Sequence, residues 1–180
     1  MHPAISVIFF TVTSGAGFGF IFLIGLGWPL AGSGVAAFFI ALFAGGLAVA
    51  GLLSSTFQHG QAERAWRAFR QWRSSWLSRE GCLAVATLTL FGLYALFWIF
   101  AGERLIWLGV LTAIFAALTV YATAMIYAQL KTVPSWKTHL TPVCYLGVAL
   151  AAGIVLAGTF SNASGVGGFP MPTWGVLAIV

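Results

Sequence analysis

Charge is what this sequence has least of. Only 6% of its 180 residues are charged, and aspartate is absent, whereas a typical soluble domain has about 25% charged residues. Hydrophobic residues make up 61% of the chain, and the mean hydropathy is +1.00. A soluble chain of this length needs a polar surface around its core. The composition therefore excludes a soluble globular domain and predicts a membrane protein that crosses the bilayer several times.

Residues that bind metals or drive acid–base chemistry are equally scarce. The two cysteines, Cys82 and Cys144, show no CxxC spacing, which argues against a structural zinc or an iron–sulfur cluster within this chain. The three histidines do not place two imidazoles on facing spans at depth, so we expect no haem with two histidine ligands. No acid falls in the middle of a predicted span, which argues against a carboxylate relay across the bilayer. We predict no metal site in this chain.

Five stretches are long and apolar enough to cross a bilayer, which takes about 20 residues of helix. They cover residues 5–27, 35–57, 82–100, 105–129 and 141–160. The N-terminus lacks the basic region of a cleaved signal, so we interpret the first stretch as a transmembrane helix. Residues 173–180 resemble the incomplete start of a sixth span, which suggests a truncated chain. The predicted fold is all-α, a polytopic transmembrane helix bundle that forms a single domain over residues 1–180.

Basic residues gather on one predicted side of this bundle. The loops at 58–81 and 131–139 hold seven of the eight Lys and Arg residues, and both loops share a side with the N-terminus. Short loops rich in Lys and Arg stay on the cytoplasmic face. We therefore expect the N-terminus and both basic loops to be cytoplasmic. If the arginines instead serve to dock a partner, the number of Lys and Arg residues in these loops is a weaker guide to the orientation of the chain in the membrane.

The segment between the second and third spans has an amphipathic pattern. At about 100° per residue, its aromatic and basic residues fall on different sides of a helix: Trp66, Phe69, Trp72 and Trp76 on one, Arg64, Arg67 and Arg70 on the other, and Arg73 at the edge. We predict an amphipathic interfacial helix here. Its rings can insert among lipid headgroups with the guanidinium groups on phosphates. Alternatively, the basic side receives an acidic surface of a partner subunit, since arginine suits ion pairs at interfaces.

His59 and Glu80 lie at the two ends of this segment, close to the membrane spans on either side. Ionisable residues at such positions are candidates for a functional site. Each also has a structural interpretation. His59 can be a loop residue bonded to a helix end, and Glu80 can lie in the first turn of the third span, stabilised by the helix dipole. From the residues alone, we rank these structural roles first.

Small, hydroxyl-bearing and aromatic residues give further expectations about packing. The Gly15–Gly19 spacing in the first span favours close approach of a second helix within the bundle. We expect the hydroxyl groups of Thr11, Thr13 and Ser14 to bond back to their own helix. Tyr121 and Tyr127 can direct a hydroxyl group into a pocket, although an interfacial position explains Tyr127 equally well. Five tryptophans near predicted helix ends are expected at the membrane interfaces: Trp28, Trp98, Trp107, Trp136 and Trp174.

The run ERAWRAFRQWRSSWLSREG (63–81) resembles the anchor subunit of bacterial dimethyl sulfoxide reductase, the DmsC family. HPAISVIFFTVTSGAGFGF near the N-terminus and YATAMIYAQLKTVPSWKT (121–138) are similar to the same family. The resemblance implies a bacterial inner-membrane subunit of eight helices that anchors two partners, a molybdopterin catalytic subunit and a four-cluster iron–sulfur subunit. It also implies oxidation of menaquinol in anaerobic respiration. The molybdopterin and iron–sulfur clusters would lie in the partners, and no cofactor would be bound by this chain.

The family pattern at the end of the second span, F-H-L-G-x-P-x-R-A, includes a histidine associated with quinol binding. Here residues 57–65 read FQHGQAERA, so the histidine position falls on Gln58 and the leucine position on His59. A shift of one residue turns the side chain by about 100° in a helix. Glutamine can bond to a quinol hydroxyl group but cannot take its proton. Glu80 matches the family's acidic residue at the head of the third span.

The resemblance therefore implies a quinol site made by Gln58, His59, Arg64 and Glu80. Partner docking would use Arg67, Arg70, Arg73 and Arg79. We expect a membrane anchor subunit of a molybdopterin oxidoreductase complex that oxidises menaquinol and passes electrons to the iron–sulfur partner. Its enzymatic role would be quinol oxidation at most. The alternative is a purely structural anchor or assembly subunit, favoured by the displaced histidine.

Overall fold

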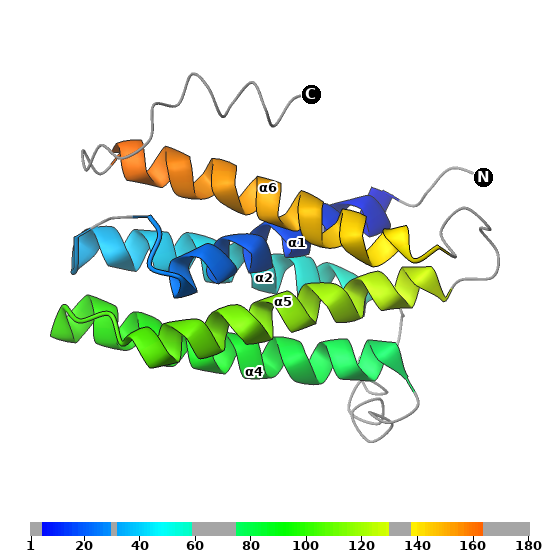
Figure 1. Ribbon diagram of the computed structural model, residues 1–180, viewed down its shortest axis with the longest axis horizontal. Helices are drawn as coiled ribbons and strands as arrows, with labels where there is room; N and C mark the ends of the chain where they lie inside the picture. The colour runs from blue at the N-terminus through cyan, green and yellow to red at the C-terminus, as the bar shows by residue number, and fades with distance from the viewer. Residues whose placement is uncertain (1–4, 30–31, 59–74, 130–137, 164–180) are drawn as a thin grey trace.

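The computed structural model describes residues 5–29, 32–58, 75–129 and 138–163, and all regular structure within them is helical. The long helices are α1 (Ile5–Gly25), α2 (Val35–Gln58), α4 (Trp76–Leu96), α5 (Ile106–Ala128) and α6 (Leu140–Ala163). A π-helical turn, η1 (Phe97–Ala101), continues α4. They run side by side along the long axis of the molecule (Figure 1). The predicted all-α class is confirmed.

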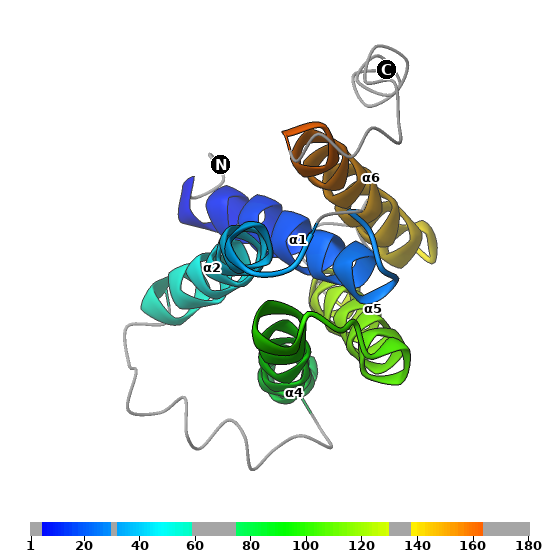
Figure 2. The same cartoon turned by 90° about the vertical axis from the view of Figure 1, so that its left-hand side faces the viewer.

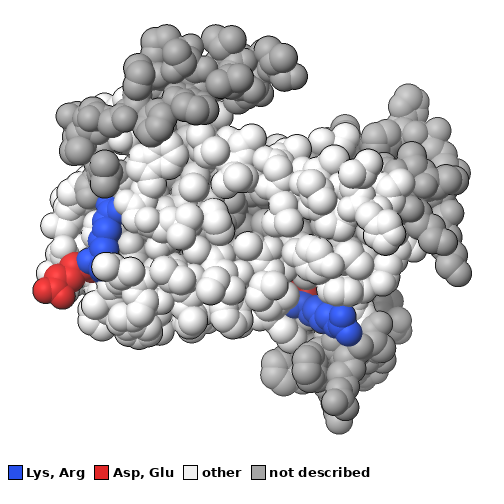
Figure 3. Space-filling view, in the orientation of Figure 1, with Lys and Arg blue, Asp and Glu red and all other residues white. Residues whose placement is uncertain are grey.

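Each long helix contains a segment apolar and long enough to cross a membrane, which confirms the five predicted spans. Figure 3 shows charged side chains only towards the two ends of the visible face, and the surface between them is uncharged. Among the described residues, the charged ones are Arg79 and Glu80 at one end and Glu103 and Arg104 at the other. An uncharged surface of this kind suits the hydrocarbon core of a bilayer. The predicted sixth span and residues 59–74 of the predicted interfacial helix lie outside the described residues.

Helix α1 occupies the centre of the bundle. It packs along α2, α5 and α6, while α4 packs mainly against α5. The end-on view in Figure 2 shows α2 and α6 on opposite sides of α1, with α4 and α5 below. More than half of the membrane-spanning window of α1 is buried, at 56%, compared with 22% in α6. The path of α1 therefore determines where the other helices can lie.

Glycines let α1 come into backbone contact with its neighbours. A methyl group at each of three positions would overlap the facing backbone: Gly17 against Ala48 of α2, Gly19 against Ala149 of α6, and Gly25 against Gly109 of α5. In lipid, helices associate by close packing, so small residues at the contact stabilise the bundle. Of the predicted pair, Gly19 makes this close approach, whereas a methyl group at Gly15 would lie 4.0 Å from the Ala149 side chain.

Three hydroxyl groups in α1 bond to their own helix, as predicted. Thr11 donates to the carbonyl of Ile8 at 3.0 Å, and Ser14 donates to that of Phe10 at 2.6 Å. Thr13 donates in the same way to a carbonyl one turn earlier, at 2.6 Å. Because these hydroxyls are satisfied locally, they can lie in an apolar bundle without lining a polar path.

The third span begins six residues earlier than predicted. Helix α4 starts at Trp76, after Ser75 in an extended conformation with φ −119° and ψ 125°. The charges at 79 and 80 suggested a water-exposed edge, but the helix continues through them because the Trp76 ring already packs on Tyr121 of α5, 6.1 Å between centroids. Glu80 therefore lies beyond the first turn of α4, which contains no acid. The helix-dipole role considered for Glu80 is wrong.

The prediction that Trp98 lies at a membrane interface is also wrong. Its side chain is 1% exposed, next to the Tyr94 ring at 6.4 Å and beneath the Arg104 guanidinium group at 4.1 Å from the ring centroid. A position near a helix end does not determine which way the ring points. Here the ring packs inside the bundle against Tyr94 and Arg104. Trp107, by contrast, is 66% exposed, as an interfacial residue should be.

Arg104 binds the turn that follows α1. Its Nη1 donates to the carbonyl of Gly27 at 2.5 Å, and its Nη2 donates to that of Pro29 at 2.9 Å. Buried backbone carbonyl groups outside regular structure need another partner, and the planar guanidinium group satisfies two of them at once. Burial lowers the pKa of Arg104 from its usual value, but an arginine remains protonated. The contacts tie the start of α5 to the end of α1.

The Gly19 contact can be tested with Gly19→Ala. The added methyl group would overlap the Ala149 backbone, so we expect a loss of about 1–3 kcal/mol in the free energy of unfolding. The matched control is Gly147→Ala in α6, where a methyl group meets nothing within 4 Å. Reversible unfolding in mixed detergent micelles measures both variants. Equal stabilities for the two variants would contradict the role of close packing at Gly19.

The contact of Arg104 with the turn after α1 can be tested with Arg104→Gln, which removes the charge and one of the two bonding arms. We expect a loss of about 1–3 kcal/mol, because the two carbonyl groups lose a charged donor. Glu103→Gln is the control, since Glu103 is exposed at the same end. Thermal unfolding followed by tryptophan fluorescence also reports the Trp98 environment. An unchanged melting temperature for Arg104→Gln would contradict a stabilising role for this contact.

Candidate functional site

A carboxyl group is buried between α4 and α5 at the end of the bundle where α4 begins. Glu80 is 3% exposed, and Thr123 on the facing helix is 6% exposed. The Thr123 hydroxyl donates to Oε1 of Glu80 at 2.6 Å, within the range of a hydrogen bond between a hydroxyl and a carboxylate. Acidic side chains are almost never so deeply buried unless they are paired. Glu80 is therefore the centre of the candidate site.

Further hydroxyl groups follow the contact of α4 and α5 inward from Glu80. The hydroxyls of Thr87 and Thr119 lie 2.9 Å apart, and Thr123 also faces the carbonyl of Thr119 at 3.1 Å. Thr87 and Thr119 are both 0% exposed. Each also lies within bonding distance of a carbonyl one turn back in its own helix, at 2.7 and 2.8 Å. The two helices are thus joined by a short polar seam that starts at Glu80.

Two tyrosines complete this end of the bundle. The rings of Tyr127 on α5 and Tyr145 on α6 stack, with centroids 5.4 Å apart and planes at 20°. Both phenol groups are close enough to Glu80 for its charge to act on them. Helices α4, α5 and α6 therefore bring a carboxyl group and two phenol groups into one neighbourhood, which we call the Glu80 site: Glu80, Thr123, Tyr127 and Tyr145.

Arg79 lies next to this site on α4. Its guanidinium group is 4.4 Å from the centroid of the Trp76 ring, and that ring meets Tyr121 edge-on. Such stacking holds a cation at a defined place on a protein surface. The half-buried Arg79 is the one predicted docking residue among those that the structure describes.

The remaining predicted site residues are placed only in part. Gln58 is the last residue of α2, and the chain then leads through residues 59–74 to α4, so Gln58 and Glu80 belong to the same end of the bundle (Figure 1). The other predicted quinol and docking residues lie outside the described residues: His59, Arg64, Arg67, Arg70 and Arg73. The proximity of Gln58, His59 and Arg64 to Glu80 stays a prediction.

Sequence reasoning missed Thr123 and Tyr145. The spacing of Thr112, Thr119 and Thr123 would have placed all three on one side of α5, seven and four residues apart. That pattern indicates a polar stripe on an otherwise apolar helix, facing a neighbouring helix. Tyr127 had two open interpretations, and the structure places it against Tyr145 near Glu80. Tyr145 shows no comparable signal in the sequence.

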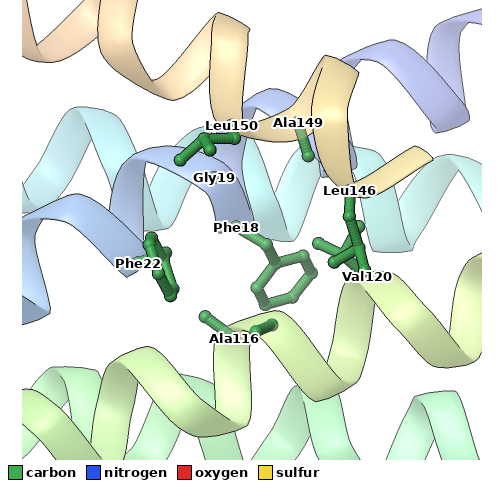
Figure 4. Close-up of a pocket in the computed structure, with 9 residues that line it drawn as sticks. Phe18, Gly19, Phe22, Ala116, Val120, Leu146, Ala149 and Leu150 are labelled. Carbon is green, nitrogen blue, oxygen red and sulfur yellow. The ribbon is translucent and has the colours of Figure 1, made fainter. Parts of the chain in front are cut away.

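An apolar pocket lies next to the Glu80 site, between α1, α5 and α6. Its volume is about 110 Å³, and Figure 4 shows side chains of the three helices turned towards it. Its lining consists of Phe18, Gly19, Phe22, Ala116, Ala117, Val120, Leu146, Ala149 and Leu150. Val120 is three residues before Thr123, and Leu146 directly follows Tyr145. At these points the pocket lining lies within one helical turn of Thr123 and Tyr145 along the chain.

Within the described ranges, no group of three or more His, Cys, Asp and Glu side chains is arranged to hold a metal ion. Cys82 and Cys144 are free thiols, with Cys144 exposed. The chemistry that these residues offer is hydrogen bonding and proton exchange at one carboxyl group.

Five apolar helices with charges confined to their ends define a multi-pass membrane protein. The family model of the DMSO reductase anchor subunit (DmsC) matches residues 1–180. The chain belongs to this family of membrane anchor subunits, which confirms the resemblance found in the sequence.

Among curated proteins, the chain is similar to one of the subunits of sulfite dehydrogenase from Allochromatium vinosum, with 37% identity over 184 residues. The match covers 89% of this chain and 56% of that relative. The chain therefore spans little more than half the length of the curated relative it matches. No solved structure matches the chain.

Proposed function

We propose that this chain anchors a molybdopterin oxidoreductase complex in the bacterial inner membrane, oxidises menaquinol at the Glu80 site and passes the electrons to an iron–sulfur partner. Membership of the DmsC family supports the anchoring role. The observation that carries the quinol chemistry is the buried Glu80 carboxyl group, held by Thr123 at one end of an otherwise apolar bundle.

Quinol oxidation releases two protons and two electrons, so its site needs a proton acceptor that a lipid-soluble ligand can reach. Glu80 supplies the acceptor, and a positioned acid or base of this kind accelerates proton transfer by about 10²–10⁴-fold. The phenol groups of Tyr127 and Tyr145 can bond to the quinol hydroxyl groups. The neighbouring pocket is lined by apolar side chains and suits the apolar part of the ligand.

Residues from the segment that precedes Glu80 in the chain would complete the site. Gln58 ends α2 at the same end of the bundle, and we propose that it, His59 and Arg64 contribute hydrogen bonds to the quinol. His59 would provide a second group that can exchange protons near neutral pH. The N-terminus and both basic loops would lie on the cytoplasmic side, where the partners bind.

Docking of the iron–sulfur subunit would use the arginines around this end. Arg79 is stacked on Trp76 beside the Glu80 site, and Arg67, Arg70 and Arg73 precede it in the chain. Docking on this side would bring an iron–sulfur cluster close to the quinol, as electron transfer requires. The molybdopterin subunit would bind to the iron–sulfur partner.

The reverse reaction, quinone reduction, is a second candidate. It is favoured by the name of the relative, because a sulfite dehydrogenase removes electrons from its substrate. In that direction Glu80 would deliver the proton. A third candidate is a purely structural anchor, favoured by the displacement of the family histidine to position 59.

Glu80→Gln tests the quinol chemistry, because glutamine keeps the shape and hydrogen bonding but cannot take up a proton. We expect reduction of the partner clusters by a menaquinol analogue to slow by about 100-fold or more. Glu103→Gln at the opposite end is the matched control and should react like the wild type. Assembly of the complex is measured in parallel by co-purification.

Three outcomes separate the candidates in that experiment. An unchanged rate of cluster reduction in the assembled Glu80→Gln complex would contradict the role of Glu80 as proton acceptor. If the quinol analogue does not reduce the partner clusters in the wild-type complex, quinol oxidation is excluded. The structural anchor and quinone reduction then remain as candidate functions. Reduction of a quinone analogue by wild-type complex with reduced clusters would then identify the reverse reaction.

Charge reversal at Arg67 and Arg70 tests the docking role. We expect Arg67→Glu with Arg70→Glu to lower co-purification of the iron–sulfur partner at least tenfold, because like charges would face each other across the interface. Arg67→Lys with Arg70→Lys keeps the charge and should retain most of the partner. If both pairs retain it equally, the arginines bind lipid phosphates and the docking proposal fails.

A further inference from the structure

The Thr123 hydroxyl group faces two acceptors but has one hydrogen to give. Oε1 of Glu80 lies at 2.6 Å and the carbonyl of Thr119 at 3.1 Å. A threonine hydroxyl has one donor and two acceptor lone pairs, so only one of the two bonds can use its hydrogen at a time. Both Glu80 and Thr123 are at least nine-tenths buried, so water does not readily replace a missing partner.

When Glu80 is ionised, the carboxylate is a pure acceptor. Thr123 then donates to Oε1, and the short distance of 2.6 Å fits a charge-assisted bond. The Thr119 carbonyl keeps its place in the α5 backbone ladder, so no group at this position loses its only partner.

When Glu80 takes up a proton, the carboxylic acid gains an O–H donor. That group can donate to the Thr123 oxygen across the same short distance, and the Thr123 hydrogen can turn to the Thr119 carbonyl. Both bonds are then made without displacement of a heavy atom. The threonine side chain needs only a rotation of its O–H bond.

We propose that Thr123 is a positioning residue whose hydrogen bond to Glu80 reverses direction when the carboxyl group gains or loses a proton. The reversal holds the carboxyl group in one place in both states, so proton transfer requires no repacking of α4 against α5. Its use in turnover rests on the proposed quinol function, whereas the reversal itself can be measured without quinol.

Few other charged or titratable groups face this pair among the described residues. Tyr127 and Tyr145 approach from α5 and α6, and their phenol groups are ordinarily neutral at physiological pH. Arg79 precedes Glu80 on α4 and stacks on Trp76. Helices α1 and α2 contain no ionisable residue. Thr123 is therefore the described residue that bonds directly to the Glu80 carboxyl group.

Infrared difference spectroscopy on the assembled complex in membranes tests the proposal. Subtraction of Glu80→Gln from wild type isolates the carbonyl band of protonated Glu80, whose position depends on the hydrogen bonds of the carboxyl group. We expect Thr123→Val to shift this band to higher wavenumber, because valine offers no acceptor. Thr123→Ser keeps the hydroxyl group and should restore the wild-type position.

The matched control is Thr112→Val. Thr112 is equally buried on α5 and bonds to the carbonyl of Leu108 at 2.8 Å, about three turns from Thr123, so its loss should leave the Glu80 band in place. Reduction of the partner clusters by a quinol analogue should fall about tenfold in Thr123→Val, the scale of one buried hydrogen bond, and return to within about twofold in Thr123→Ser.

A Glu80 band at the same position in Thr123→Val and wild type would overturn the proposal. If the Thr123→Val complex does not assemble, the position of the Glu80 carbonyl band in the wild type tests the proposal. A band at the position typical of a carboxyl group without hydrogen bonds would contradict the reversal. A shifted band together with unchanged quinol oxidation in Glu80→Gln would leave the reversal standing and reject the quinol function.

Discussion

Inside a bilayer, the hydrophobic effect does not hold helices together, because lipid is as apolar as the helix surface. This bundle relies instead on backbone contact along α1, where Gly17, Gly19 and Gly25 each meet a different neighbour so closely that a methyl group would overlap it. The positions of α2, α5 and α6 follow from these contacts. Arg104 adds a second constraint at one end, where it ties the end of α1 to the start of α5. A site at the opposite end can therefore use groups from several helices whose spacing is already set.

The Glu80 site shows how a bundle packed in this way accommodates a polar group. Glu80 comes from α4, Thr123 and Tyr127 from α5, and Tyr145 from α6. A buried carboxyl group is tolerated when it is hydrogen-bonded, and the threonine provides that bond within an otherwise apolar contact. Under the proposed function, the apolar pocket would receive the lipid-soluble ligand, Glu80 would exchange its proton, and the basic residues of the 58–81 segment would bind the partner. This combination is what a subunit that exchanges electrons with a membrane quinol would need.

Much of the fold could be predicted, since five long apolar stretches allow few arrangements other than a helix bundle. The close approach at Gly19 and the internal bonds of Thr11 and Ser14 followed from spacing and from the chemistry of hydroxyl groups in lipid. The start of α4 was predicted six residues too late, because charges at 79 and 80 suggested an edge while Trp76 packs on α5. Glu80 was found as a candidate, but its partner Thr123 depends on which sides of two helices meet. The direction of the Trp98 ring likewise depends on its contacts with Tyr94 and Arg104, which a position near a helix end does not reveal.

The central claim is that a quinol binds at the end of the bundle where α4 begins. A photoreactive menaquinone analogue bound to the assembled complex, followed by mass spectrometry of the labelled peptides, tests it most directly. The account predicts labels near Glu80, within 121–128 of α5 and within 140–150 of α6, and loss of these labels when excess menaquinone competes. Competable labels confined to the opposite end, around η1 and Arg104, would contradict it.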